Sequence, residues 1–162
     1  MAKIYISLGS NIEPAHYIRV AVKELTALLG PLRLSSVFES EAVGFSGDNF
    51  LNMVVAAETE LSVAELVSQF KQIELRNGRA AHAVKFAPRT LDLDLLLYDN
   101  AVITQPVVLP RAEILTNAFV LWPLAELAPA LQHPIAGLPY QTLWQNYDKS
   151  QQRLWQVDFD WQ

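Results

Sequence analysis

The most restrictive feature of this sequence is the order in which two apolar periodicities alternate along it. Where every second residue is apolar we expect a strand, and where apolar residues recur three and four positions apart we expect a helix. The resulting order, β-α-β-β-α-β, predicts an α+β fold of the ferredoxin-like kind, with helices packed on one face of an antiparallel sheet. The expected strands are 3–8, 32–40, 50–58 and 90–98, and the expected helices are 14–29 and 63–77.

Signals outside this pattern complete the expected organisation. Ser62, followed three residues later by Glu65, predicts a capping box at the start of the second helix. Beyond the core we expect C-terminal additions: a helix within 117–129, and one more strand in the alternating tail 153–162. Since the sequence has no internal repeat, linker or low-complexity segment, we expect a single domain spanning residues 1–162.

Composition excludes several classes of protein. The 51% of hydrophobic residues argues against disorder, and the lack of cysteine excludes disulfides and thiolate catalysis. No apolar run approaches the roughly 20 residues that span a bilayer, and the N-terminus does not resemble a signal peptide. A net charge of -5 argues against nucleic acid as the main partner. We therefore expect a cytoplasmic monomer that binds neither nucleic acid nor membrane.

Two aspartates interrupt the apolar run of the last expected core strand. Alternation in "TLDLDLLLY" places Leu91, Leu93, Leu95 and Leu97 on the core face, and Asp92 and Asp94 on the other face. Residues two apart in a strand lie about 6.5–7 Å apart, so both carboxylates can converge on hard cations such as Mg²⁺. The alternative interpretation is a solvated outer face with surface ion pairs of little energetic value.

Basic residues cluster around this strand and favour the first interpretation. Arg76, Arg79 and Lys85 lie in or beside the polar loop that precedes the strand, and Arg89 lies at its start. Cations next to metal-binding carboxylates indicate a polyphosphate ligand. The sequence has no G-x-x-x-x-G-K-[ST] motif, so a nucleotide would not be bound by a P-loop.

The segment "KFAPRTLDLDLL" and four further segments resemble one known family. They are similar to the 6-hydroxymethyl-7,8-dihydropterin pyrophosphokinases of folate biosynthesis, over about residues 3–129, whereas the last thirty or so residues carry no signature. The resemblance implies transfer of a pyrophosphoryl group from ATP to the hydroxymethyl oxygen of the pterin, with release of AMP. The four supporting segments are "YISLGSN", "FLNMVV", "IELRNGR" and "FVLWPLAELAP".

The resemblance also implies residues for the ATP side of the site. Two Mg²⁺ ions would be held by Asp92 and Asp94, either of which could also accept the hydroxyl proton, unless metal coordination makes a base unnecessary. Glu74 would help to fix the nucleotide. The cations implied to contact phosphates, which with the two aspartates form the implied catalytic set, are Arg79, Lys85 and Arg89.

On the pterin side, the resemblance implies an aromatic sandwich and an amide that reads the ring. Phe50 and Phe119 would cover the two ring faces, although by composition alone core packing is the better explanation of these phenylalanines. Asn52 would recognise the amide edge through its donor and acceptor. The backbone groups implied to complete the site are those near Gly9, Ser40 and Val43.

Several positions depart from the family pattern. Arg111 follows Pro110 where the family usually has histidine, and it is expected to contact phosphate bidentately. Asn117 and Ala81 stand where the family usually has basic residues, and Ser40–Glu41 replaces a Thr-Pro pair. We expect an active enzyme of reduced efficiency, or one whose substrate has drifted. The alternative is a pterin-binding relative that lost productive ATP use.

A different class of protein shares the predicted topology. RNA-recognition domains also run β-α-β-β-α-β, but they carry exposed aromatic residues in a characteristic third strand and usually a basic surface. The third strand here, "NFLNMVVAAE", lacks that pattern, and the chain is acidic. We therefore reject this alternative.

Overall fold

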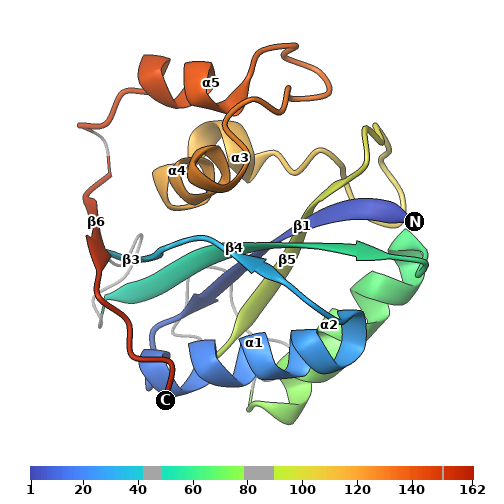
Figure 1. Ribbon diagram of the computed structural model, residues 1–162, viewed down its shortest axis with the longest axis vertical. Helices are drawn as coiled ribbons and strands as arrows, with labels where there is room; N and C mark the ends of the chain where they lie inside the picture. The colour runs from blue at the N-terminus through green and yellow to red at the C-terminus, as the bar shows by residue number, and fades with distance from the viewer. Residues whose placement is uncertain (42–48, 79–89, 151) are drawn as a thin grey trace.

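A single antiparallel sheet forms the middle layer of the computed structural model, which describes residues 1–41, 49–78, 90–150 and 152–162 (Figure 1). The strand order is β5-β1-β4-β3-β6, with β2 pairing to β4 beside β3. The part β5-β1-β4-β3 is the order of a ferredoxin-like sheet, so the predicted fold class is confirmed. The strands are β1 (Ala2–Ser10), β2 (Arg33–Leu34), β3 (Val37–Ser40), β4 (Phe50–Thr59), β5 (Asp92–Tyr98) and β6 (Leu154–Val157).

Helices cover both faces of the sheet, not one as the sequence led us to expect (Figure 1). Two long helices, α1 (Pro14–Leu29) and α2 (Val63–Arg76), pack on one face. The other face is covered by α3 (Glu113–Thr116), α4 (Ala118–Leu127) and α5 (Tyr140–Asn146). The β-α-β-β-α-β pattern includes only the helices of one layer, so it does not predict the second. Helix α4 is apolar on nearly all sides and is therefore suited to burial between the sheet and α5.

The second expected strand is interrupted. Instead of one strand over 32–40, the chain forms β2 and β3 with Ser35 and Ser36 between them. The Ser35 Oγ accepts a hydrogen bond from the Val54 amide at 2.9 Å, and the Ser35 amide donates to the Val54 carbonyl at 2.9 Å. A serine side chain can thus take over a ladder hydrogen bond, which permits the break without leaving the Val54 amide unpaired.

The expected face of Leu97 is wrong. The pairing of β5 with β1 shifts register where Tyr5 opposes Leu97 and Ile6 opposes Leu95, so Leu96 is the extra residue of a β-bulge. Leu93 and Leu95 face the core under α1 and α2, whereas Leu96 and Leu97 both pack under α4. The bulge therefore ends the strict alternation just beyond the two aspartates.

Two local expectations are confirmed. The Ser62 Oγ accepts from the Glu65 amide at 3.1 Å, and a Glu65 carboxylate oxygen accepts from the Ser62 amide at 3.0 Å, which is the predicted capping box. The predicted tail strand forms over the four residues of β6, which pairs with β3. Within the described ranges, no helix is both long and apolar enough to cross a bilayer.

Candidate active site

The candidate site is built on one row of residues that oppose one another across the sheet. Asp92 on β5 opposes Gly9 on β1, Gly9 opposes Asn52 on β4, and Asn52 opposes Phe38 on β3. Directly opposed residues of antiparallel strands project to the same face. That face is the one covered by α4, because the Phe38 ring lies 4.6 Å from the Trp122 ring of that helix. The aspartates and the predicted pterin residues therefore share one face.

Asp94 lies one pleat further along the same face and forms an ion pair. An Arg111 guanidinium nitrogen lies 2.8 Å from the Asp94 Oδ1, and both side chains are partly exposed, at 27% and 34%. The Arg111 amide also donates to the Leu96 carbonyl at 3.0 Å, which holds the segment against β5. Sequence reasoning assigned Arg111 to phosphate and missed this contact, because nothing local pairs residues so far apart in the chain.

The donor set at Asp92 and Asp94 suits a hard divalent cation. Across the described parts of the chain, no cluster of three or more His, Cys, Asp or Glu side chains is arranged to hold a metal. Mg²⁺ does not need such a cluster, since it usually takes one or two carboxylates and completes its octahedron with waters and substrate phosphates. Two partly exposed carboxylates on one face fit that requirement.

Glu74 is buried beneath β5 and binds its backbone. A Glu74 carboxylate oxygen accepts a hydrogen bond from the Leu93 amide at 2.7 Å, and the residue is only 8% exposed. Leu93 lies between the two aspartates, so this contact holds the strand from which both carboxylates project. The expectation that Glu74 helps to fix the nucleotide stays a prediction.

Four of the predicted pterin residues lie together. Asn52 is 4% exposed, and its Nδ2 donates to the Ser40 Oγ at 2.8 Å. A Cβ placed on Gly9 would lie 3.2 Å from the Asn52 Oδ1 and 4.0 Å from the Phe50 ring, so glycine permits this close packing. Phe119 is half-buried in the first turn of α4, the helix that packs over β4 and β3.

One positioning contact was missed from the sequence. The Ser10 hydroxyl, at the end of β1, donates to the Thr90 carbonyl just before β5. Ser10 is fully buried, so its hydroxyl requires such a partner. The polar residues that follow the first strand could have suggested this bond, because a buried serine beside a strand end commonly binds backbone.

Several predicted site residues lie outside the described residues. They are Val43 on the pterin side and Arg79, Lys85 and Arg89 on the phosphate side, together with the departure at Ala81. Their predicted roles therefore stay predictions.

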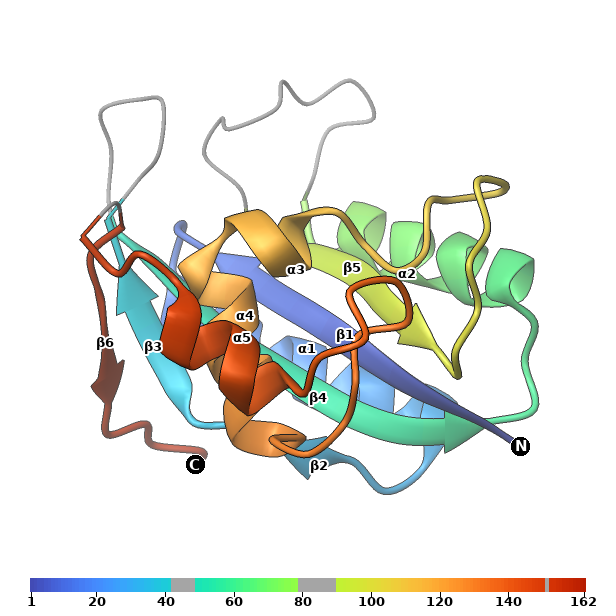
Figure 2. The same cartoon turned by 90° about the horizontal axis from the view of Figure 1, so that it is seen from above.

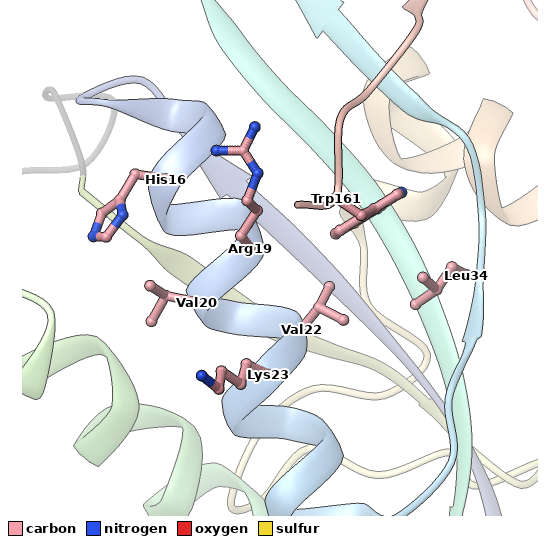
Figure 3. A pocket seen from close by; sticks show the side chains of 7 residues that line it. All are labelled: His16, Arg19, Val20, Val22, Lys23, Leu34 and Trp161. Carbon is pink, nitrogen blue, oxygen red and sulfur yellow. The ribbon is translucent and has the colours of Figure 1, made fainter.

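A groove of about 570 Å³ lies elsewhere, between α1 and the end of the chain (Figure 3). It is lined by residues from α1, by Leu34 of β2 and by Trp161. Because α1 packs on the face opposite the aspartates, this groove is separate from the candidate site.

Paired carboxylates and a guanidinium on one face of an α+β sheet fit the class of metal-dependent phosphoryl-transfer enzymes. The model of the 7,8-dihydro-6-hydroxymethylpterin-pyrophosphokinase (HPPK) family matches residues 5–129. The chain belongs to this family, whose members use ATP and generally Mg²⁺.

Proteins from several bacteria are similar to this chain over most of its length. The 2-amino-4-hydroxy-6-hydroxymethyldihydropteridine pyrophosphokinase of Aquifex aeolicus is 38% identical over 142 residues, 86% of this chain and 88% of that protein. The enzyme of the same name from Bacillus subtilis is 38% identical and covers 79% of each chain. The Pseudomonas aeruginosa enzyme is 35% identical, covering 82% of this chain and 84% of that one.

Solved structures support the fold. Plasmodium falciparum HPPK-DHPS, a triple mutant with pteroate, superposes with a TM-score of 0.74 over 93% of this chain, at 12% identity. The wild-type protein gives a TM-score of 0.71 over 90%. This chain spans 44% of each of those chains, so only the fold is carried over.

Proposed function

We propose that this chain transfers a pyrophosphoryl group from ATP to the hydroxymethyl oxygen of 6-hydroxymethyl-7,8-dihydropterin, releasing AMP. The observation that carries the proposal is the shared face of Asp92, Asp94 and the Gly9–Asn52–Ser40 group. Carboxylates for metal-bound phosphates, on β5, and a buried amide for a heterocycle, on β4, lie on one face of the sheet on either side of β1. Family membership and relatives named as pyrophosphokinases support the same reaction.

On the phosphate side, we propose that Asp92 and Asp94 hold two Mg²⁺ ions. When bound, these ions neutralise charge on the triphosphate and align the attacking and leaving oxygens. The two carboxylates supply ligands from a strand that Glu74 fixes through the Leu93 amide. Arg79, Lys85 and Arg89 contact phosphates in this proposal.

Arg111 has two successive partners in the proposed cycle. Before ATP binds, it neutralises Asp94, as in the 2.8 Å ion pair. A partly exposed ion pair contributes only about 0–1 kcal/mol, so Arg111 would release Asp94 for metal binding at small cost. Arg111 then turns to phosphate, which its planar group can bind bidentately.

On the pterin side, Asn52 provides hydrogen bonds to the ring. One of its two Nδ2 protons is used by the Ser40 Oγ, so the second proton and the Oδ1 lone pairs serve for recognition of an amide edge. Phe50 and Phe119 stack on the ring faces, and backbone near Gly9, Ser40 and Val43 completes the contacts. The pterin hydroxymethyl oxygen is thereby directed toward the aspartates.

We further propose that the chain acts as a monomeric single domain in the cytoplasm, without nucleic-acid or membrane partners. The acidic balance, 17 acidic against 12 basic residues, supports the lack of a nucleic-acid partner.

AMP formation from ATP, Mg²⁺ and the pterin tests the proposal directly. We expect Asp94→Asn to lower turnover at least about 100-fold, because a lost metal ligand removes several kcal/mol of transition-state stabilisation. Asp99→Asn is the matched control: Asp99 follows β5, its Oδ1 accepts from the Lys3 amide at 2.8 Å, and asparagine keeps that acceptor and tolerates its positive φ.

Two results would contradict the proposal. If the unmodified protein binds the pterin but releases no AMP at saturating ATP and Mg²⁺, the chain is a pterin-binding relative. Equal turnover by Asp94→Asn and Asp99→Asn would remove Asp94 from the metal site.

A further inference from the structure

The residues beyond the family match contact both sides of the proposed pterin site. The family model ends at residue 129, and the segment that follows carries no motif. In the fold this segment forms α5, returns along the edge of the sheet as β6, and pairs with β3 (Figures 1 and 2). The two contact regions are the first turn of α4 and the end of β3.

At the first turn of α4, a glutamine supplies a missing cap. The helix's own N-cap residue, Asn117, makes no side-chain capping hydrogen bond. The Gln152 Oε1 accepts from the Ala118 amide at 2.7 Å instead, and thus binds one of the amides that a helix N-terminus leaves unpaired. Phe119 is the next residue along the helix, so the cap fixes the backbone from which its ring projects.

A second contact holds the approach to this turn. The Tyr147 hydroxyl donates to the Thr116 carbonyl at 2.7 Å, and the Gln152 Nε2 donates to the same carbonyl at 3.4 Å. Thr116, which lies just before the first turn of α4, is therefore held by the C-terminal segment from both ends of the connection between α5 and β6.

At the end of β3, the same segment binds the other wall of the proposed site. Leu154 opposes Ser40 in the β3–β6 pair, and the Glu41 amide donates to the Arg153 carbonyl at 3.4 Å. Ser40 is the residue whose Oγ accepts from Asn52. Gln152, which caps α4, is two residues from Leu154, which pairs with Ser40.

We propose that Gln152 is a positioning residue for pterin binding: it fixes the first turn of α4, with Phe119, relative to Ser40 and Asn52. This role rests on the proposed function of Phe119 and Asn52. It assigns a purpose to a part of the chain that the family match does not cover. Because the contact lies on the pterin wall and not at the aspartates, its loss affects one substrate and not the other.

The test compares three variants of the full-length protein. Gln152→Ala removes the acceptor, and loss of an N-cap typically lowers the equilibrium constant for forming the capped helix turn about 5–10-fold. We expect the KM for the pterin to rise by that factor while the KM for ATP changes less than about twofold. Gln152→Glu retains the acceptor, which is favoured at a helix N-terminus, but loses the donor to the Thr116 carbonyl, so it should recover part of the pterin KM. Gln145→Ala, at an exposed glutamine of α5, is the matched control and behaves as the unmodified protein.

Hydrogen exchange separates the contact from its consequence. The Ala118 amide should exchange faster in Gln152→Ala than in the unmodified protein, which verifies that the cap is lost. Faster exchange of the Ala118 amide with an unchanged pterin KM overturns the proposal. A parallel rise of both KM values together with a lower Tm also overturns it, because that result indicates a general loss of stability. Absence of turnover by the unmodified protein contradicts the proposed function itself, and is seen before any variant is compared.

Discussion

Arg111 occupies the position after Pro110 where the resemblance leads us to expect histidine. The Arg111 guanidinium, which is longer than an imidazole and always charged, reaches the Asp94 carboxylate. Its Nε also lies 3.4 Å from a Glu113 carboxylate oxygen, which orients the group along the edge of the site. In the proposed function, this departure places a competitor for the metal at Asp94 and a cation for phosphate in one side chain.

Arg111→Ala is expected to separate these two effects. Removing the guanidinium removes one competitor for the Asp94 carboxylate, so Mg²⁺ or Mn²⁺ should bind up to about fivefold more tightly without nucleotide, the equivalent of an exposed ion pair of about 1 kcal/mol. The KM for ATP should rise, because a charge-assisted contact to phosphate is lost. Calorimetric titration with the metal alone and steady-state kinetics measure the two changes.

Arg33→Ala provides the comparison, since Arg33 is an exposed arginine of β2. Metal binding that weakens in Arg111→Ala, or stays as in Arg33→Ala, would show that the Asp94–Arg111 pair does not compete with the metal.

Strand β5 depends on a hydrogen bond from outside the sheet. Glu74→Ala leaves the buried Leu93 amide without its acceptor, which should lower the free energy of unfolding by about 1–3 kcal/mol. The same change should reduce turnover, because Asp92 and Asp94 flank Leu93. Urea denaturation and AMP release measure both effects. Glu74→Gln retains an acceptor oxygen and should recover most of the stability; if it loses as much as Glu74→Ala, the hydrogen bond is not the cause.

The turn between α4 and α5 should be sensitive to acid. The Nδ1 of buried His133 accepts from the Ile135 and Ala136 amides at 3.1 and 3.0 Å, and burial lowers the pKa of His133 from its usual 6.5. The unfolded chain therefore binds the proton more strongly, so this contribution to stability is complete above pH 6.5 and is lost as the pH falls below it.

The free energy of unfolding, measured at about pH 7.5 and pH 5, reports this loss of stability. Carboxylates that titrate at low pH also contribute to the change, so a variant without the His133 ring is needed for comparison. His133→Asn keeps an acceptor near the Nδ1 position without a titrating ring. The unmodified protein should lose more stability on acidification than His133→Asn, and an equal loss in both would exclude His133 as the source.

At the scale of elements, prediction from sequence succeeded where the signal is local. The Ser62–Glu65 cap and the placement of Asp92 and Asp94 on the face opposite Leu93 and Leu95 depend on spacing within a few residues. The face of Leu97 could not be predicted, because the bulge at Leu96 exists only in the pairing of β5 with β1. The Asp94–Arg111 contact was missed for a similar reason, since it depends on how the segment before α3 returns to β5.

At the scale of the whole molecule, the chain end connects the two helical layers. After β6 it crosses to α1, where the Arg19 guanidinium lies 5.1 Å from the centre of the Phe159 ring and its Nε donates to the Asp160 carbonyl at 2.6 Å (Figure 3 shows Arg19 beside Trp161). Phe159 packs against the core under α1. The tail thus contacts the face opposite the aspartates.

Deleting residues 158–162 should therefore affect stability and not chemistry. Loss of the half-buried Phe159 and of the Arg19 contacts should cost about 1–2 kcal/mol, which corresponds to a Tm lower by roughly 2–8 °C. The kcat and both KM values should stay as in the unmodified protein. Calorimetry and kinetics on the same preparations check this; impaired turnover with an unchanged Tm would mean that the tail acts on the site.

The row Asp92–Gly9–Asn52 has a consequence for which molecules can react. Its three strands are held by backbone hydrogen bonds at a spacing of about 4.8 Å, so the Cα atoms of Asp92 and Asn52 are separated by about 10 Å whatever side chains fill the core. In the proposed function, this separation sets a fixed length between a heterocycle at Asn52 and phosphates at Asp92. We therefore expect an acceptor whose hydroxyl arm is one carbon longer to exceed that length and react poorly, so that the sheet itself would select acceptors by length.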